Sequence, residues 1–363
     1  MFLLLYFLIF LNVVYGQGDD PFSNDFIRRK NLSDLKDTVL GEVAGNIPPE
    51  DKDGLYYFII TLFVMSTFAS TILTGVFLAL SVILWSHFKK MIFFWFLTQL
   101  TISVFIMSSL NFLINVPATL FALITKEFVQ SASFYYMSNV IDFCHNAILF
   151  SNLIIAIHRM FVFFFKKHTD IAFEKPITYF WMGMVWVLSA FVVVSMIMNN
   201  CQYEYDERIL MKHYVLSCET SSGIKNIAPP TIVQTIEILI QFILPIFILG
   251  IYIAIIIKII LMKKAALNKY ELTILKQAVF IFCLFQISSS VFLLCQTIKF
   301  EIATAFLIKR IINTTEICAG AATPCFFFFT SKEIRKLVSV RVSLTTSQAN
   351  SNSQQRRQTS RAI

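Results

Sequence analysis

Seven long apolar segments constrain this chain more than any other feature of its sequence. A hydrocarbon core of about 30 Å requires roughly twenty apolar residues in a helix that rises 1.5 Å per residue, and each segment is that long. The charged fraction is only 14%, against roughly 25% in soluble domains. The sequence therefore predicts an all-α, seven-transmembrane helix bundle over residues 55–330. The predicted spans are 56–85, 91–116, 134–165, 177–198, 232–261, 273–297 and 303–329.

The last of these segments is less apolar than the others, because Lys309, Arg310 and Glu316 fall in its first half. Long basic side chains near a helix end reach toward the membrane interface, and we expect Lys309 and Arg310 to do so. The alternative is that this segment is a re-entrant hairpin.

The amino-terminal apolar stretch, residues 2–14, is too short to span a bilayer. It predicts a signal peptide over residues 1–16, with small Gly16 at the cleavage point, and the alternative is a retained apolar end at the interface. Residues 17–54 are polar and hold the sequon Asn31-Leu32-Ser33, so we expect a short extracellular segment with a glycan on Asn31.

The distribution of charge predicts the orientation. With the amino terminus outside, the cytoplasmic parts hold 18 of the 30 Lys and Arg residues but only 4 of the 22 Asp and Glu residues. This arrangement satisfies the positive-inside rule, so the carboxyl terminus is expected to be cytoplasmic. The basic residues stand at the ends of apolar runs, which indicates membrane topology and not a nucleic-acid surface. Residues 331–363 are Ser-, Thr- and Gln-rich and are expected to form a disordered tail.

Two of the 7 cysteines, Cys201 and Cys218, lie in a predicted outside loop. Because that compartment is oxidising, we expect them to form a disulfide, which would contribute roughly 3 kcal/mol on the chain-entropy view. The alternatives are that one pairs elsewhere or that both stay free. The other five lie in predicted spans, where a cysteine acts as a small apolar residue.

Ionisable side chains inside a bilayer cost about 2.5 to 3.5 kcal/mol on insertion scales, so each requires a reason. Asp142 and His145 are three residues apart and share a helical face. Together with Glu316 they predict either a small-molecule pocket in the outer half of the bundle or a buried hydrogen-bond network. The five histidines are scattered and no catalytic or phosphate-binding motif is evident, so we expect no metal site, no cofactor and no enzyme activity.

The end of the third span carries Ile157-His158-Arg159-Met160-Phe161 after a long apolar helix and before a basic loop. This position resembles the Asp/Glu-Arg-Tyr motif of G-protein-coupled receptors, and the stretch 153–164 is still more similar to nematode serpentine chemoreceptors of the gamma-type superfamily. Further similarity lies in Trp186, in Pro245, in the polar segment 269–273, and in Thr323-Pro324-Cys325-Phe326-Phe327 followed by a basic segment. The resemblance covers roughly residues 56–336.

The resemblance implies a receptor that binds a small molecule and couples to a heterotrimeric G protein through Arg159 and His158, at the plasma membrane and, if chemosensory, in sensory cilia. The chain departs from the common receptor pattern in several places. His158 replaces the acidic neighbour of Arg159, and Thr323 and Phe327 replace Asn and Tyr. For Arg159 the alternative is a charge that only sets topology. For the whole chain the alternatives are a seven-span ligand-gated channel or transporter and a membrane protein without signalling.

Overall fold

The computed structural model describes residues 49–89, 91–120, 132–206, 213–219, 225–226, 230–261 and 302–330, and positions 279, 283 and 287. This part of the chain is mostly helical, with one small sheet. The predicted signal peptide, the sequon at Asn31, the sixth predicted span and the tail 331–363 lie outside the described residues. The short elements are η4 (Pro49–Asp51), α5 (Trp85–Phe88), α7 (Val116–Leu120) and α10 (Lys166–Ala172).

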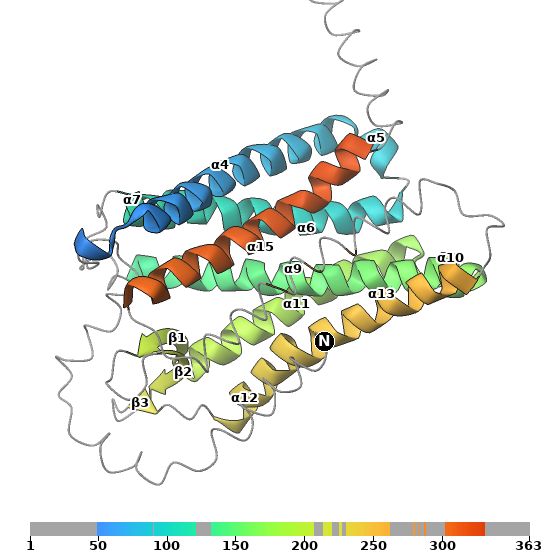
Figure 1. Cartoon of the computed structure of the whole chain (residues 1–363). Helices are drawn as coiled ribbons and strands as arrows, with labels where there is room; N and C mark the ends of the chain where they lie inside the picture. Colours follow the sequence, from blue (N-terminus) through green and yellow to red (C-terminus); the bar gives the residue numbers. More distant parts are fainter. Residues whose placement is uncertain are drawn as a thin grey trace, which may run out of the picture.

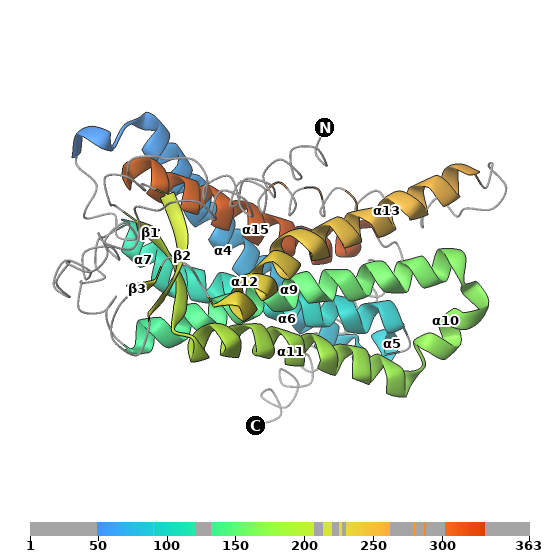
Figure 2. The same cartoon turned by 90° about the horizontal axis from the view of Figure 1, so that it is seen from below.

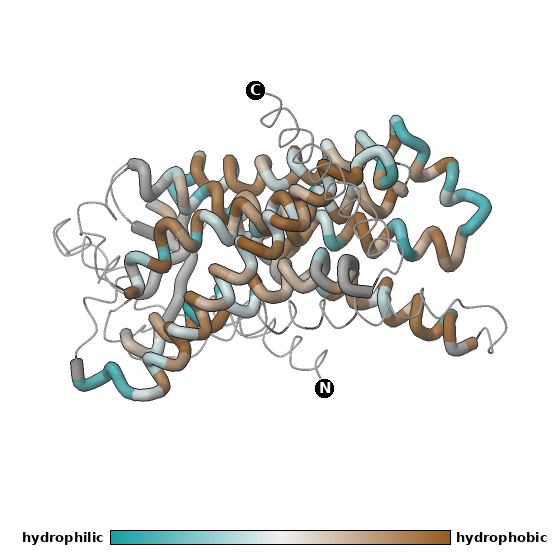
Figure 3. The backbone as a smooth tube through the Cα atoms, turned by 90° about the horizontal axis from the view of Figure 1, so that it is seen from above, coloured by the Kyte–Doolittle hydropathy of each residue, from teal (hydrophilic) through white to brown (hydrophobic). Residues whose placement is uncertain are grey.

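Within the described residues, four helices are long and apolar enough to cross a membrane. They are α4 (Gly54–Ile83), α6 (Ile92–Leu110, continued by η5), α9 (Ala132–Phe164) and α11 (Lys175–Met198). Each lies within a few residues of a predicted span, because the apolar run and the polar residues that flank it fix where the helix begins and ends. In α4, for example, the Asp53 carboxylate accepts a hydrogen bond from the Tyr56 N–H at 2.8 Å and caps the first turn. Figure 3 shows the apolar middle of the bundle between hydrophilic ends.

In the part of the chain that the structure describes, two π-helical turns interrupt otherwise regular helices. Residues Asn111–Asn115 form η5 within the α6–α7 segment, and Leu239–Ile243 form η6 between α12 (Thr231–Ile238) and α13 (Leu244–Leu261). Each turn ends two residues before a proline, Pro117 or Pro245. A proline ring clashes with the carbonyl group four residues earlier, and the wider turn makes room for it.

The last described helix, α15, runs without a break from Ile302 to Thr330. The alternative of a re-entrant hairpin for this segment is therefore wrong. At 29 residues the helix is about 43 Å long at 1.5 Å per residue. It is not among the four described helices that are long and apolar enough to cross a membrane.

Helix α9 lies at the centre of the described bundle, in contact with α6, α11 and α13, while α4 packs against both α15 and α6 (Figure 1). Helices α15 and α6 approach closely at Gly320, where an added Cβ would stand 2.8 Å from the Val104 Cγ2 atom. A side chain at Gly320 would therefore push the two helices apart. In both Figure 1 and Figure 2 the strands lie at one end of the bundle and α10 at the other. We call these the hairpin end and the α10 end.

The hairpin end carries a three-stranded antiparallel sheet of β1 (Cys201–Asp206), β2 (His213–Glu219) and β3 (Lys225–Asn226), in that order. Cys201 pairs with Cys218 in the register of β1 and β2 and forms a disulfide with it, so the predicted bond is confirmed. Both cysteines are buried against Val233 and Met196, which fixes the hairpin to the ends of α12 and α11. The sequence analysis did not predict these strands.

Candidate functional site

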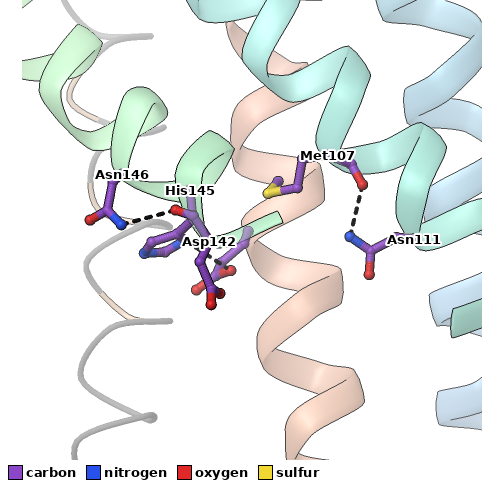
Figure 4. A network of polar contacts seen from close by, with 6 residues as sticks. Met107, Asn111, Asp142, His145 and Asn146 are labelled. Carbon is purple, nitrogen blue, oxygen red and sulfur yellow. Dashed lines mark hydrogen bonds and ion pairs between the residues drawn. The ribbon is translucent and has the colours of Figure 1, made fainter. Parts of the chain in front are cut away.

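A polar cluster joins α9 to α15 in the half of the bundle nearer the hairpin. The His145 Nδ1 atom lies 3.4 Å from the Glu316 Oε2 atom, and the two side chains are 33% and 16% exposed. Asp142, one turn earlier on the same face of α9, is exposed and interacts electrostatically with His145. The structure thus brings together the three residues that were predicted to face one another, and Figure 4 shows Asp142 and His145 beside α15.

Hydrogen bonds within α9 and α6 flank this cluster. The Asn146 amide donates to the Asp142 carbonyl oxygen at 2.9 Å, and the Asn111 amide donates to the Met107 carbonyl oxygen at 2.9 Å (Figure 4). In the π turn η5 the Asn115 amide donates to the Asn111 side-chain oxygen at 2.7 Å. The sequence analysis missed this asparagine pair, although the i, i+4 spacing of two amides before a proline is visible in the sequence.

The cluster presents polar groups that can bond to a small molecule or link α9 to α15 by hydrogen bonds. Part of the His145 and Glu316 side chains stays accessible. His145 can donate or accept a hydrogen bond, and the two carboxylates can accept from a ligand donor. In the described part of the chain no group of three or more His, Cys, Asp or Glu side chains is arranged to hold a metal ion.

Arg159 lies at the other end of α9, near α10, and is withdrawn into the bundle. Its side chain is 9% exposed. The guanidinium carbon lies 5.3 Å from the centre of the Phe93 ring on α6, and the phenol of buried Tyr252 on α13 interacts with it electrostatically. Arg159 therefore touches two neighbouring helices. The sequence analysis predicted Arg159 as a functional residue but did not identify Phe93 or Tyr252.

His158 stands among aromatic rings. Its ring centre lies 4.8 Å from that of Phe173, 6.0 Å from Phe96 and 6.4 Å from Phe93. Among the residues that the structure describes, the His158 Nδ1 atom is buried and has no hydrogen-bond partner. His158 thus contributes packing beside Arg159, where an acidic residue would contribute a charge.

Phe173 fixes the connection between α10 and α11 to the bundle. Its side chain is fully buried and contacts Phe96, His158, Phe161 and Trp181. The Thr178 hydroxyl donates to the Phe173 carbonyl oxygen at 3.0 Å, and the Trp181 indole N–H donates to the Ala172 carbonyl oxygen at 3.3 Å. The basic helix α10 is thereby held in place next to Arg159.

A second arginine, Arg310 on α15, is also buried, with 1% of its surface exposed. Its guanidinium carbon lies 5.1 Å from the ring centre of Phe63 and 4.8 Å from that of Phe306. The expectation that Arg310 reaches the membrane interface is therefore wrong, because the side chain turns inward between α15 and α4. Aromatic faces attract a guanidinium through the ring quadrupole and offer it an alternative to water.

The sequence profile of a family described as "Protein of unknown function (DUF621)" matches residues 45–351. No curated protein matches the chain.

Proposed function

The chain belongs to the DUF621 family of proteins of unknown function, and we propose that it is a chemosensory G-protein-coupled receptor with seven membrane-spanning helices. In this proposal the hairpin end is extracellular and the α10 end is cytoplasmic. The ligand is a small molecule, and the signalling partner is a heterotrimeric G protein. The receptor would reside in the plasma membrane, including that of sensory cilia.

One observation carries the proposal: a single helix, α9, holds both charged sites. Asp142 and His145 lie toward the hairpin end and Arg159 lies at the α10 end, about 20 Å apart at 1.5 Å per residue. Helix α9 also contacts α6, α11 and α13. A ligand that binds one arrangement of these helices more tightly than another shifts their populations, and the shift reaches Arg159 through the same helix.

The ligand-binding role is supported by the accessible part of the His145–Glu316 pair and by exposed Asp142. Ionisable groups at this depth are rare and are retained mainly for function. A small molecule that bonds to His145 or Glu316 changes the contact between α9 and α15. The disulfide fixes the hairpin close to this end of the bundle.

The coupling role is supported by the position of Arg159 beside the basic helix α10. Arginine keeps its charge at physiological pH and has a planar fork of five donors, which suits the carbonyl groups at the end of a docked helix. Coupling requires that the guanidinium leave its place under Phe93.

A transporter or channel is the second candidate, because proton-coupled transporters also place His and Glu side chains inside the bilayer. Expression in a reporter cell distinguishes the two. A panel of volatile and water-soluble compounds should elicit signalling that requires GTP. Ligand-dependent current or uptake in cells whose G proteins are inhibited would instead favour the transporter.

Epitope tags test the proposed topology. A tag placed after Gln17 should be accessible on intact cells, and one placed after Ile363 should require permeabilisation. Opposite labelling would contradict the receptor proposal, since Arg159 would then face the wrong side of the membrane.

A further inference from the structure

At the α10 end of the bundle, Arg159 of α9 contacts Phe93 of α6. Phe93 stands in the first turn of α6, which begins at Ile92, and its ring covers the Arg159 guanidinium from the neighbouring helix. The same ring also lies next to His158. Phe93 therefore contacts both positions of the His158-Arg159 pair from α6.

A ring face binds a guanidinium differently from a carboxylate. A carboxylate holds a guanidinium through directed, often bidentate hydrogen bonds, whereas a ring face attracts it without fixed hydrogen-bond geometry. The contact depends on the ring being in place over the charge, so a movement of α6 relative to α9 that displaces the ring would break it. Such a contact retains the charged side chain and still permits its release.

We propose that Phe93 is a positioning residue that keeps the Arg159 guanidinium inside the bundle until the receptor is activated. With 9% of its surface exposed, Arg159 presents little of its donor fork to a docked protein in this arrangement. Release from Phe93 would make the fork available. The inference rests on the proposed coupling role of Arg159, but the position of the guanidinium can be measured without any G protein.

Arginine modification by phenylglyoxal provides that measurement. The full chain, purified in detergent, is treated with the reagent, and the modification rate of the Arg159 peptide is followed by mass spectrometry. We expect Phe93→Leu to raise the rate several-fold over the wild type and Phe93→Tyr, which retains the ring face, to leave it within twofold. Arg310, covered by Phe63 and Phe306, serves as the internal standard and should stay protected in all samples.

The neighbouring residue supplies a matched control. Phe94 is also a phenylalanine at the start of α6 and is fully buried, but its ring stacks on Phe88 at 3.7 Å. Phe94→Leu should therefore leave the Arg159 rate near that of the wild type. If Phe93→Leu does not fold, replacement of Phe93 by cyclohexylalanine, which keeps the volume and removes the aromatic face, takes its place.

Two outcomes would overturn the inference. One is an unchanged Arg159 rate when the aromatic face is removed, and the other is an equal increase in Phe94→Leu. Basal GTP-dependent signalling separates this inference from the proposed function. Faster Arg159 modification in a chain that never signals would reject the receptor role and leave the positioning by Phe93 standing. Faster modification together with increased basal signalling would support both.

Discussion

The two ends of α9 hold their charged residues by different means. Near the hairpin, His145 is joined to Glu316 on α15 by an ion pair with a defined N–O distance of 3.4 Å. Near α10, Arg159 lies against the face of Phe93 on α6, with its neighbour His158 enclosed by further rings. An ion pair specifies one geometry, whereas a ring face tolerates several. Under the proposed function, the hairpin end selects a ligand and the α10 end changes state.

Removal of the Arg159 charge gives the largest expected effect. Arg159→Ala should abolish ligand-dependent signalling at nearly unchanged surface abundance, because it removes the donor fork and leaves the buried apolar residues of α9 in place. Arg159→Lys should restore only part of the signal, since lysine lacks the planar fork. The control is Arg310→Ala, which removes the other buried arginine and should retain ligand-dependent signalling. If Arg159→Ala signals normally, Arg159 serves only as a charge that sets the membrane topology.

Loss of the disulfide tests whether the two ends are independent. The double substitution of Cys201 and Cys218 by Ser should lower the free energy of unfolding by roughly 3 kcal/mol. The phenylglyoxal reactivity of Arg159 should not change, because the bond lies at the opposite end of the bundle. Thermal unfolding in detergent gives the first quantity and peptide mapping the second. Increased Arg159 reactivity would show that the hairpin constrains the whole bundle.

The ion pair should have a measurable coupling energy. We expect His145→Ala and Glu316→Gln to show a coupling of about 1 to 2 kcal/mol in a double-mutant cycle, since the pair is partly buried and charge-assisted. Thermal unfolding of the two single variants and the double variant gives the value. The control pairs Glu316→Gln with Asn146→Ala, which acts within α9, and these changes should be additive. If the effects of His145→Ala and Glu316→Gln on stability are additive, the ion pair does not link α9 to α15.

The ring contact should have the smallest effect on stability. A cycle of Phe93→Leu and Arg159→Met is expected to give a coupling of about 0.5 to 1 kcal/mol, the range for a cation near an aromatic face. A coupling larger than that of the ion pair would reverse the comparison, because the α10 end would then be the more firmly held of the two.

The helices could be predicted from the sequence because their apolar runs have lengths set by the bilayer. Predicted span 134–165 corresponds to α9 at Ala132–Phe164, and 177–198 to α11 at Lys175–Met198. The strands were missed, although Cys201-Gln202-Tyr203-Glu204-Tyr205-Asp206 alternates apolar and polar residues, the period of a strand. The alternation was overlooked because only the cysteines of this loop were considered.

The candidate site was predictable in part. Asp142 and His145 could be paired because helical spacing places them on one face, and Glu316 because it is a rare carboxylate in an apolar segment. Phe93 could not be found, since in a chain with 39 phenylalanines no spacing distinguishes the one that covers Arg159. The prediction for Arg310 was wrong for a similar reason. The direction of its side chain depends on packing against Phe63, which lies in a helix distant in the sequence.

The two π turns affect how the chain can vary in length. A π turn holds one residue more than the α turn that it replaces, so deletion of one residue from Asn111–Asn115 or Leu239–Ile243 restores a regular helix and preserves the facing of the residues on both sides. A deletion elsewhere in the same helices would rotate everything that follows by about 100°, at 3.6 residues per turn. The shortened helix would place a carbonyl group against the ring of Pro117 or Pro245. Deletion of one residue at either turn should therefore require that the proline be replaced as well.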